Sequence, residues 1–175
     1  VKLSVVCVSL LATVSLLTAG CSSTPADKTA TMSPNRIYAE AKEEIAASQW
    51  ERAIPLLEKL EARAAGTPLA QQAQLDKAYA QYKSSESAQA LATLERFTKL
   101  HPVSPAMDYA IYLRGVINFT DDLGLFAKFT RQDLTERDQK ASKESFEAFK
   151  ELVDRFPDSR YANDARQRMN YIVSA

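Results

Sequence analysis

The sequence predicts an all-α fold in which helix–turn–helix pairs stack into a solenoid. Glycine occurs only four times in 175 residues, while residues that favour helices, such as Ala, Leu, Gln, Glu and Lys, are abundant. From Asn35 onward, apolar residues recur at spacings of three and four, which places them on one stripe of each helix. Pro68 and Pro102 punctuate this pattern, and each of them ends one helical pair and opens the next.

Residues 1–20 predict a secretory signal peptide. Lys2 is the only charged side chain before an apolar stretch that ends in Gly20 and Cys21. A cysteine at this exit is similar to a bacterial lipoprotein signal. The resemblance implies that Cys21 carries acyl chains such as palmitate, and Ser22 after it implies sorting to the outer membrane. Each buried methylene contributes about 0.8 kcal/mol, so several chains anchor a protein durably. The alternative is an ordinary leader with an unmodified thiol.

Residues 21–34 follow the leader as a predicted flexible tether, because they are small and polar and lack apolar periodicity. Residues 35–175 form the predicted repeat domain. Without residues 1–20 the chain has 21 basic and 22 acidic side chains, a formal charge of −1, so nothing in its charge suggests nucleic acid as a partner. Cys7 lies in the leader, which leaves Cys21 as the single thiol and excludes a disulfide within one mature chain.

The predicted helices follow in pairs. They span residues 34–47 and 50–64, then 68–83 and 87–100, then 106–119 and 139–155, and a fourth pair is represented by its first helix at 162–173. Pro55 is discordant, because proline inside a helix removes one hydrogen bond and crowds the previous turn. The second helix is therefore expected either to start after Trp50 or to bend at Pro55.

The step from Pro68 to Pro102 matches the period of tetratricopeptide repeats, which is about 34 residues. Two helices of such a pair approach closely only where one presents a small residue. Ala53, Ala90 and Gly115 fit these small positions, and Ser145 lies as far before Pro157 as Ala90 lies before Pro102. The turn between the two helices of the second pair is expected to be longer by one or two residues than in a usual repeat. A generic helical bundle with coincidental proline spacing is the alternative.

Three segments stand out beside the lipoprotein signal: QWERAIPLLEKLEAR, MDYAIYLRG and FPDSRYANDAR. Together they resemble the BamD family, formerly called ComL. The resemblance implies the lipoprotein subunit of the outer-membrane β-barrel assembly machinery, held by its lipid on the periplasmic face. It also implies three kinds of partner: BamA, the other subunits of the complex, and unfolded outer-membrane β-barrel proteins. Members of the family carry more helical pairs than this chain, so the C-terminus is expected to be incomplete.

A stacked solenoid presents a groove lined by the first helices of its pairs, and such a groove suits an extended peptide. Aromatic residues on the first helices are candidates for apolar contacts, and neighbouring polar residues are candidates for contacts with a peptide backbone. The candidates are Tyr79, Tyr82, Tyr109, Tyr112, Arg114 and Asn118. The alternative is that the tyrosines pack between helices with their hydroxyls at the rim.

The segment 120–138 is longer than a normal repeat turn and is too apolar for a simple solvated loop. Leu123, Leu125, Phe126 and Phe129 are its apolar residues. Long loops on rigid scaffolds are often functional. One interpretation is that the segment folds back onto the third pair or the groove, and the other is that it docks a partner.

Enzymatic motifs are absent from the sequence. His101 is the only histidine and precedes Pro102 in a turn, and Asp121 and Asp122 lack a third acidic ligand at matching spacing. We therefore expect no metal and no cofactor beyond the lipid on Cys21. Three hypotheses remain: a barrel-assembly subunit, another periplasmic tetratricopeptide lipoprotein that coordinates envelope or division proteins, and a lipoprotein enzyme such as a peptidoglycan hydrolase. The lack of a catalytic constellation argues against the third.

Overall fold

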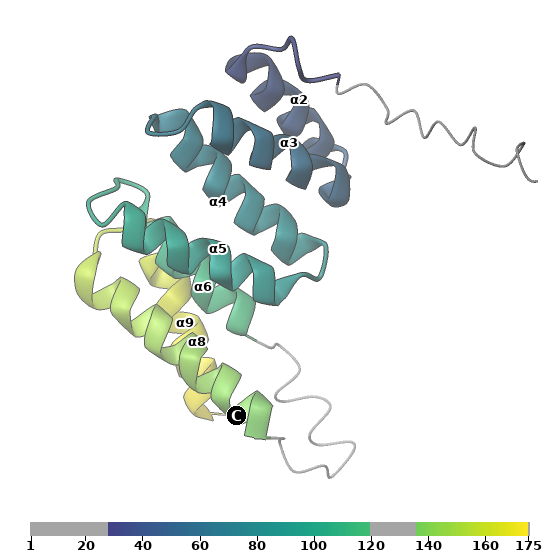
Figure 1. Cartoon of the computed structure of the whole chain (residues 1–175). Helices are drawn as coiled ribbons and strands as arrows, with labels where there is room; N and C mark the ends of the chain where they lie inside the picture. Colours follow the sequence, from purple (N-terminus) through teal and green to yellow (C-terminus); the bar gives the residue numbers. More distant parts are fainter. Residues whose placement is uncertain (1–27, 120–135, 175) are drawn as a thin grey trace, which may run out of the picture. The chain divides into compact units, whose positions relative to one another are not determined.

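The computed structural model describes residues 28–119 and 136–174, with side chains of residues 136–138 excepted. The chain divides into two units, residues 1–32 and residues 33–175, and the helices described all lie in the second unit (Figure 1). The predicted all-α repeat fold is confirmed over the described residues. The helices are α2 (Pro34–Ala46), α3 (Trp50–Arg63), α4 (Pro68–Lys83), α5 (Ser87–Leu100), α6 (Met107–Asn118), α8 (Glu136–Arg155) and α9 (Ala162–Ser174).

Two of the first helices begin with the same local chemistry. The Ser33 hydroxyl accepts a hydrogen bond from the backbone N–H of Arg36, and the Thr67 hydroxyl accepts one from Ala70, each at 3.3 Å. The next residue in each case is a proline, whose missing N–H and fixed φ suit the first helical position. Pro34, which was predicted both as the end of the tether and as the start of the first helix, is thus the first residue of α2.

The inner turns of the first two pairs are built alike. Ser48 and Ser85 adopt left-handed backbone conformations with φ of 57° and 68°. Around them the N–H of Gln49 reaches the carbonyl of Glu44, and that of Glu86 reaches Gln81, both at 2.8 Å. This is the Schellman pattern of helix ends. Both turns span three residues between helices, so the longer inner turn expected for the second pair was wrong.

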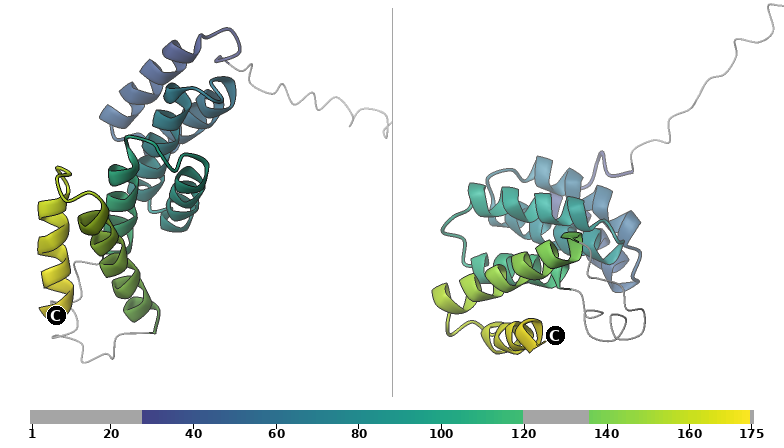
Figure 2. Two further views of the ribbon diagram at one scale, coloured as in Figure 1. Left: turned by 90° about the vertical axis from the view of Figure 1, so that its left-hand side faces the viewer. Right: turned by 90° about the horizontal axis from the view of Figure 1, so that it is seen from below.

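Helices of the second unit pack on their neighbours in chain order, from α2 on α3 to α8 on α9, and α4 also contacts α6 (Figure 2). Two apolar clusters meet at α6. One joins α4, α5 and α6 around Leu94 and Phe97, and the other joins α6, α8 and α9 around Ile111, Phe149 and Leu152. The third pair therefore has its core on both sides of its first helix.

The predicted small positions are points of close helix contact. Ala53, Ala90 and Ser145 are fully buried. A Cβ atom added to Gly115 would lie 2.5 Å from the ring of Phe149, so glycine is what allows α6 and α8 to approach. The Ser145 hydroxyl donates to the Gly115 carbonyl at 2.9 Å across the same contact.

Two boundaries differ from expectation. Helix α3 begins at Trp50 and runs through Pro55, so the alternative of a later start was wrong. Pro55 is exposed, and its ring therefore faces away from the neighbouring helices. Helix α8 begins at Glu136, three residues before the predicted start, so the segment between α6 and α8 is shorter than residues 120–138. Residues 120–135 lie outside the described part of the chain. They include the four apolar residues Leu123, Leu125, Phe126 and Phe129.

Candidate functional site

Tyrosine–carboxylate hydrogen bonds join the first helices of neighbouring pairs. The Tyr38 hydroxyl of α2 donates to Asp76 of α4 at 3.0 Å, and the Tyr112 hydroxyl of α6 donates to Asp164 of α9 at 2.7 Å. Partial burial, together with the adjacent carboxylate, raises the pKa of both tyrosines to about 12. The two hydroxyls therefore stay protonated and act as donors at neutral pH.

Tyr161, at the turn between α8 and α9, extends this arrangement into an aromatic stack. Its ring is stacked on Tyr112 at a centroid distance of 4.6 Å and lies 5.6 Å from the ring of Tyr109. Burial raises the pKa of Tyr109, with the charges of Tyr161 and Asp76 adding to the shift. The stack brings the turn before α9 next to the start of α6.

A cavity of about 440 Å³ lies beside this stack, and we call it the α4–α6 cavity. It is open to solvent and combines apolar, aromatic and charged side chains. Its lining consists of Gln72, Leu75, Asp76, Pro105, Ala106, Asp108, Tyr109, Arg160 and Tyr161. Its exposed wall is more polar than apolar, so the cavity suits a ligand that brings hydrogen-bonding or charged groups.

The charged groups of the α4–α6 cavity are fixed by several elements. Asp76 accepts hydrogen bonds from Gln72 at 3.0 Å and, more loosely, from Lys42 at 3.5 Å. Asp108 accepts from the backbone N–H of Tyr109 and from the Ser159 hydroxyl, each at 2.7 Å. These contacts hold both carboxylates in position at the cavity wall.

Arg114 and Asn118 line a different cavity, of about 470 Å³, which we call the α5–α8 cavity. Arg114 forms an ion pair with Glu151 of α8. Although partial burial opposes it, the hydrogen bond and charge of Arg114 lower the pKa of Glu151 below its ordinary value. The Asn118 amide donates to the Arg114 carbonyl of its own helix at 3.3 Å. The structure thus separates these two residues from Tyr109.

Tyr79 and Tyr82 are partly buried and pack against the cluster of α4, α5 and α6. The Tyr79 ring meets Trp50 edge-on at 5.8 Å. Of the six predicted peptide contacts, Tyr109 alone lines the α4–α6 cavity, and Tyr112 supports it through Tyr161.

Sequence reasoning did not single out Tyr38, Asp76, Asp108 or Arg160 as site residues. Arg160 and Tyr161 belong to the segment FPDSRYANDAR, which indicated a family but no role for either residue in a site. The signal available for Tyr38 and Asp76 was their place on the first helices of successive pairs, 38 residues apart. That spacing alone does not reveal which way the side chains point.

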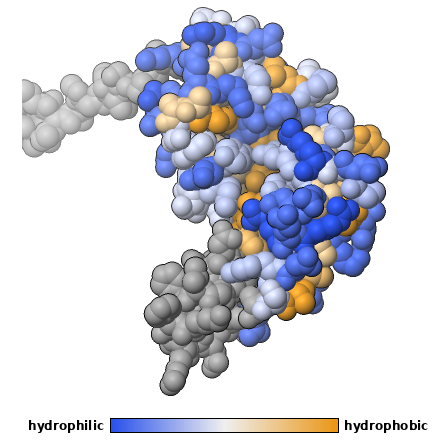
Figure 3. Space-filling view, turned by 180° about the vertical axis from the view of Figure 1, so that it is seen from behind, coloured by the Kyte–Doolittle hydropathy of each residue, from blue (hydrophilic) through white to orange (hydrophobic). Residues whose placement is uncertain are grey.

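Cys21 lies outside the described residues. Within the described ranges, no cluster of three or more His, Cys, Asp or Glu side chains is arranged to hold a metal ion. No helix there has both the length and the apolar character needed to cross a bilayer. In the space-filling view of Figure 3, hydrophilic residues cover most of the coloured surface, with isolated hydrophobic patches between them.

Comparisons with known proteins agree with the architecture. A family model described as tetratricopeptide repeat matches residues 25–169. The outer membrane protein assembly factor BamD of Neisseria gonorrhoeae is 47% identical over 95% of this chain and 65% of its own length. BamD of Neisseria meningitidis serogroup B is 49% identical over 82% of this chain and 54% of the relative, and BamD of Vibrio cholerae is 39% identical over 86% and 62%.

The chain thus spans between about half and two thirds of the length of these curated relatives. The match runs through the helices that build both cavities. The chain belongs to the tetratricopeptide repeat proteins and, within them, to the BamD family of outer membrane protein assembly factors.

Proposed function

We propose that the chain is a non-enzymatic, peptide-binding subunit of the complex that assembles β-barrel proteins in the outer membrane. The relatives' name, outer membrane protein assembly factor, supports the assembly role. The observation that carries the binding role is the α4–α6 cavity, which opens beside the tyrosine stack formed by α6 and the turn before α9. In this proposal, unfolded barrel proteins bind there as extended segments.

The chemistry of the cavity fits such a ligand. An extended peptide offers backbone N–H and C=O groups along its length and side chains on alternate sides. Gln72 is exposed at the cavity and can pair with a peptide backbone, while Pro105, Ala106 and Tyr109 give an apolar surface for a side chain. The tyrosine stack is rigid, so little conformational entropy is lost when a ligand packs against it.

The location and partners complete the proposal. Acyl chains on Cys21 hold the protein on the periplasmic face of the outer membrane, and the repeat unit contacts BamA and the other subunits of the complex. The signal sequence and the relatives' name support both points. The chain has no cofactor in this proposal apart from its covalent lipid.

Site-specific photo-crosslinking in cells tests the binding role. A photo-reactive residue at Gln72, which is exposed at the cavity, is expected to capture unfolded outer-membrane β-barrel proteins. The same residue at Glu58, which is exposed on α3 and does not line the cavity, serves as the matched control and is expected to capture none. Equal capture at both positions would contradict binding at this site.

Affinity purification from detergent-solubilised outer membranes, with a tag after Ala175, tests the assembly role. BamA and barrel proteins are the expected partners, and a Cys21→Ser variant is expected to leave the membrane fraction. Recovery of cell-division or envelope proteins without any assembly subunit would overturn the proposal. It would favour the alternative of a different periplasmic tetratricopeptide lipoprotein.

A further inference from the structure

The α4–α6 cavity has an asymmetric set of charges. Asp76 and Asp108 contribute two carboxylates from two helices, and among the described residues that line the cavity Arg160 is the one basic side chain. Both hydrogen bonds that Asp108 accepts come from neutral donors, a backbone N–H and the Ser159 hydroxyl. These two donors hold its negative charge in place without neutralising it, and Arg160 is the cation of the cavity whose charge interacts with it.

Arg160 indicates which charge the cavity favours. Its guanidinium lies 4.7 Å above the ring of Tyr161 and donates to the Tyr161 hydroxyl. The hydrogen bond to Tyr161, followed by the charges of Tyr161, Asp108 and Tyr109, raises the pKa of Arg160. Although Arg160 is fully exposed, its surroundings stabilise the cationic form, so the edge of the cavity already holds a guanidinium.

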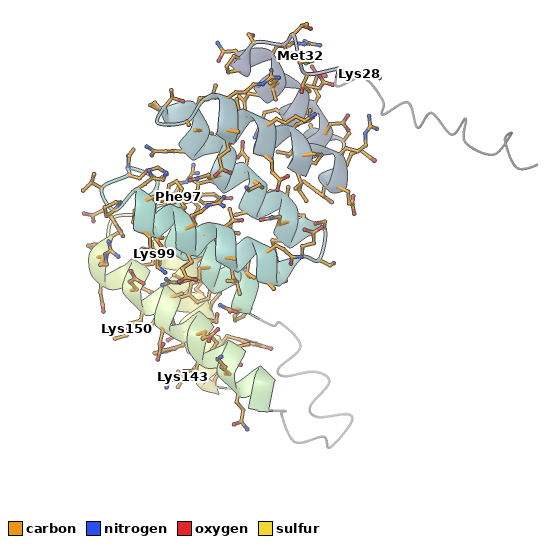
Figure 4. The ribbon with its side chains drawn as sticks, in the orientation of Figure 1. Lys28, Met32, Phe97, Lys99, Lys143 and Lys150 are labelled. Atoms are coloured by element: carbon orange, nitrogen blue, oxygen red, sulfur yellow. The ribbon has the colours of Figure 1, made fainter. Side chains whose placement is uncertain are left out.

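In the α4–α6 cavity Asp76 pairs with Lys42 at 3.5 Å, so Asp108 is the carboxylate there whose hydrogen bonds come from neutral donors alone. The α5–α8 cavity offers no such carboxylate among its described residues. Four glutamates line it, but each is neutralised by a basic residue nearby. Lys99 lies on α5 and Lys143 on α8 (Figure 4). They pair with Glu95 and Glu147 at 2.6 and 3.9 Å. Glu144 pairs with Lys140 at 3.7 Å, and Glu151 pairs with Arg114. A cation entering this cavity would meet carboxylates that already have ionic partners.

We propose that the α4–α6 cavity binds an arginine or lysine side chain of the bound segment, with the aliphatic stem on Pro105 and Ala106 and the cationic head between Asp108, Asp76 and the tyrosine faces. This inference rests on the proposed function for the identity of the segment. The chemistry is that of cation–π contact combined with charge-assisted hydrogen bonding. Arg160 competes for the same carboxylate and ring and yields to the incoming cation.

Two short labelled peptides test the proposal by fluorescence anisotropy with the full chain in detergent. Both have alternating polar and apolar residues and an amidated C-terminus, and they differ only in a central arginine or citrulline. Citrulline keeps the shape of arginine and removes its charge. The arginine peptide is expected to bind about tenfold more tightly, as one charge-assisted contact predicts.

Substitutions of the charged residues are expected to change the preference for arginine in defined directions. Asp108→Asn is expected to reduce the preference for arginine to about twofold or less, and Asp76→Asn is expected to reduce it partly, because each removes one negative charge. Arg160→Gln is expected to strengthen binding of the arginine peptide, because it removes the internal competitor. Glu58→Gln, on the exposed face of α3, is the matched control and is expected to change nothing.

Three outcomes would overturn the proposal. Equal affinity for the two peptides would mean that the cavity does not select charge. Weaker binding by Arg160→Gln would mean that the arginine recruits an anionic group instead. Binding of neither peptide would remove the cavity as a site for cationic side chains. None of these results affects the recovery of BamA in the affinity purification, so failure here and failure of the proposed function are distinguishable.

Discussion

At the scale of single residues, Gly115 determines how closely α6 and α8 pack. The ring of Phe149 is fully buried and occupies the space that a Cβ atom would need, with ring carbons 2.5–2.9 Å from that position. Glycine inside a helix is normally unfavourable by about 1 kcal/mol relative to alanine. Here the packing gain outweighs that cost, because the alternative is displacement of a ring in a dense core.

Gly115→Ala is expected to destabilise the protein by about 1–3 kcal/mol, the usual range for overpacking. Chemical denaturation of the variant measures this difference. In a Phe149→Leu background the same substitution is expected to be neutral or stabilising, because the smaller side chain leaves room for the methyl group. A destabilisation of equal size in both backgrounds would show that Phe149 is not the obstacle.

The importance of Gly115 was predictable, because a close helix contact needs a small residue at that place in the repeat. The separation of Arg114 and Asn118 from the tyrosine stack could also have been predicted, from the angle between successive residues of a helix. Residues 112 and 114 are about 200° apart at about 100° per residue, whereas 109 and 112 share one face. The role of Arg160 was not predictable, since its place at the cavity depends on how a turn far downstream in the sequence packs against the start of α6.

At the scale of elements, Glu61 of α3 holds three helices together. It accepts hydrogen bonds from Gln74 and Lys77 of α4 at 2.8 and 2.7 Å and from Arg96 of α5 at 2.9 Å. The Lys77 side chain is only 7% exposed, and its ammonium pairs with Glu61. Partial burial raises the pKa of Glu61, but the bonds from Gln74 and Lys77 and the charges of Lys77 and Arg96 outweigh it and lower the pKa below 4.5.

Because the folded chain holds this pKa below its unfolded value, Glu61 contributes stability that is fully present above about pH 4.5 and is lost as the pH falls through the lower folded value. Glu61→Gln is expected to cost about 1–2 kcal/mol at neutral pH, a figure reduced for the partial exposure of the carboxylate. Denaturation curves of the variant are expected to depend less on pH on the acid side. Lys99→Gln, which removes an exposed pair with Glu95, is the control with little effect.

Helix boundaries were predicted well where proline and a hydroxyl cap coincide, as at Pro34 and Pro68, because both act locally. The start of α8 was predicted three residues too late, because residues 136–138 (Glu-Arg-Asp) include no apolar residue that marks the helix. The network of Glu61 was also invisible in the sequence. Its partners are spread over residues 74–96, on two other helices, and charged residues on helices are usually solvated.

At the scale of the whole repeat unit, stability is distributed among neighbouring elements. Helices contact chiefly their neighbours in chain order, and the apolar clusters on the two sides of α6 are formed by different helices. Such an arrangement resembles a one-dimensional series of coupled repeats, in which a local change is felt mainly by adjacent elements.

Phe149→Ala is expected to speed amide hydrogen exchange in α6, α8 and α9 and to leave α2 and α3 protected, because the lost contacts belong to the cluster of the last three helices. Leu57→Ala, at a fully buried position of α3, is the reciprocal variant and is expected to affect α2 to α4. Exchange measured by mass spectrometry distinguishes these patterns. A uniform loss of protection in either variant would mean that the unit unfolds as a single cooperative block.

The packing of Trp50 gives the protein a built-in optical reporter. It is the only tryptophan of the chain, it lies at the first residue of α3, and its ring meets Tyr79 of α4 edge-on at 5.8 Å with the Lys83 ammonium 5.9 Å from its centre. The tyrosines of the cavity, in contrast, gather around α6 and the turn before α9. Selective excitation of the indole therefore reports on the α3–α4 junction, separately from the tyrosines of the cavity and without any label.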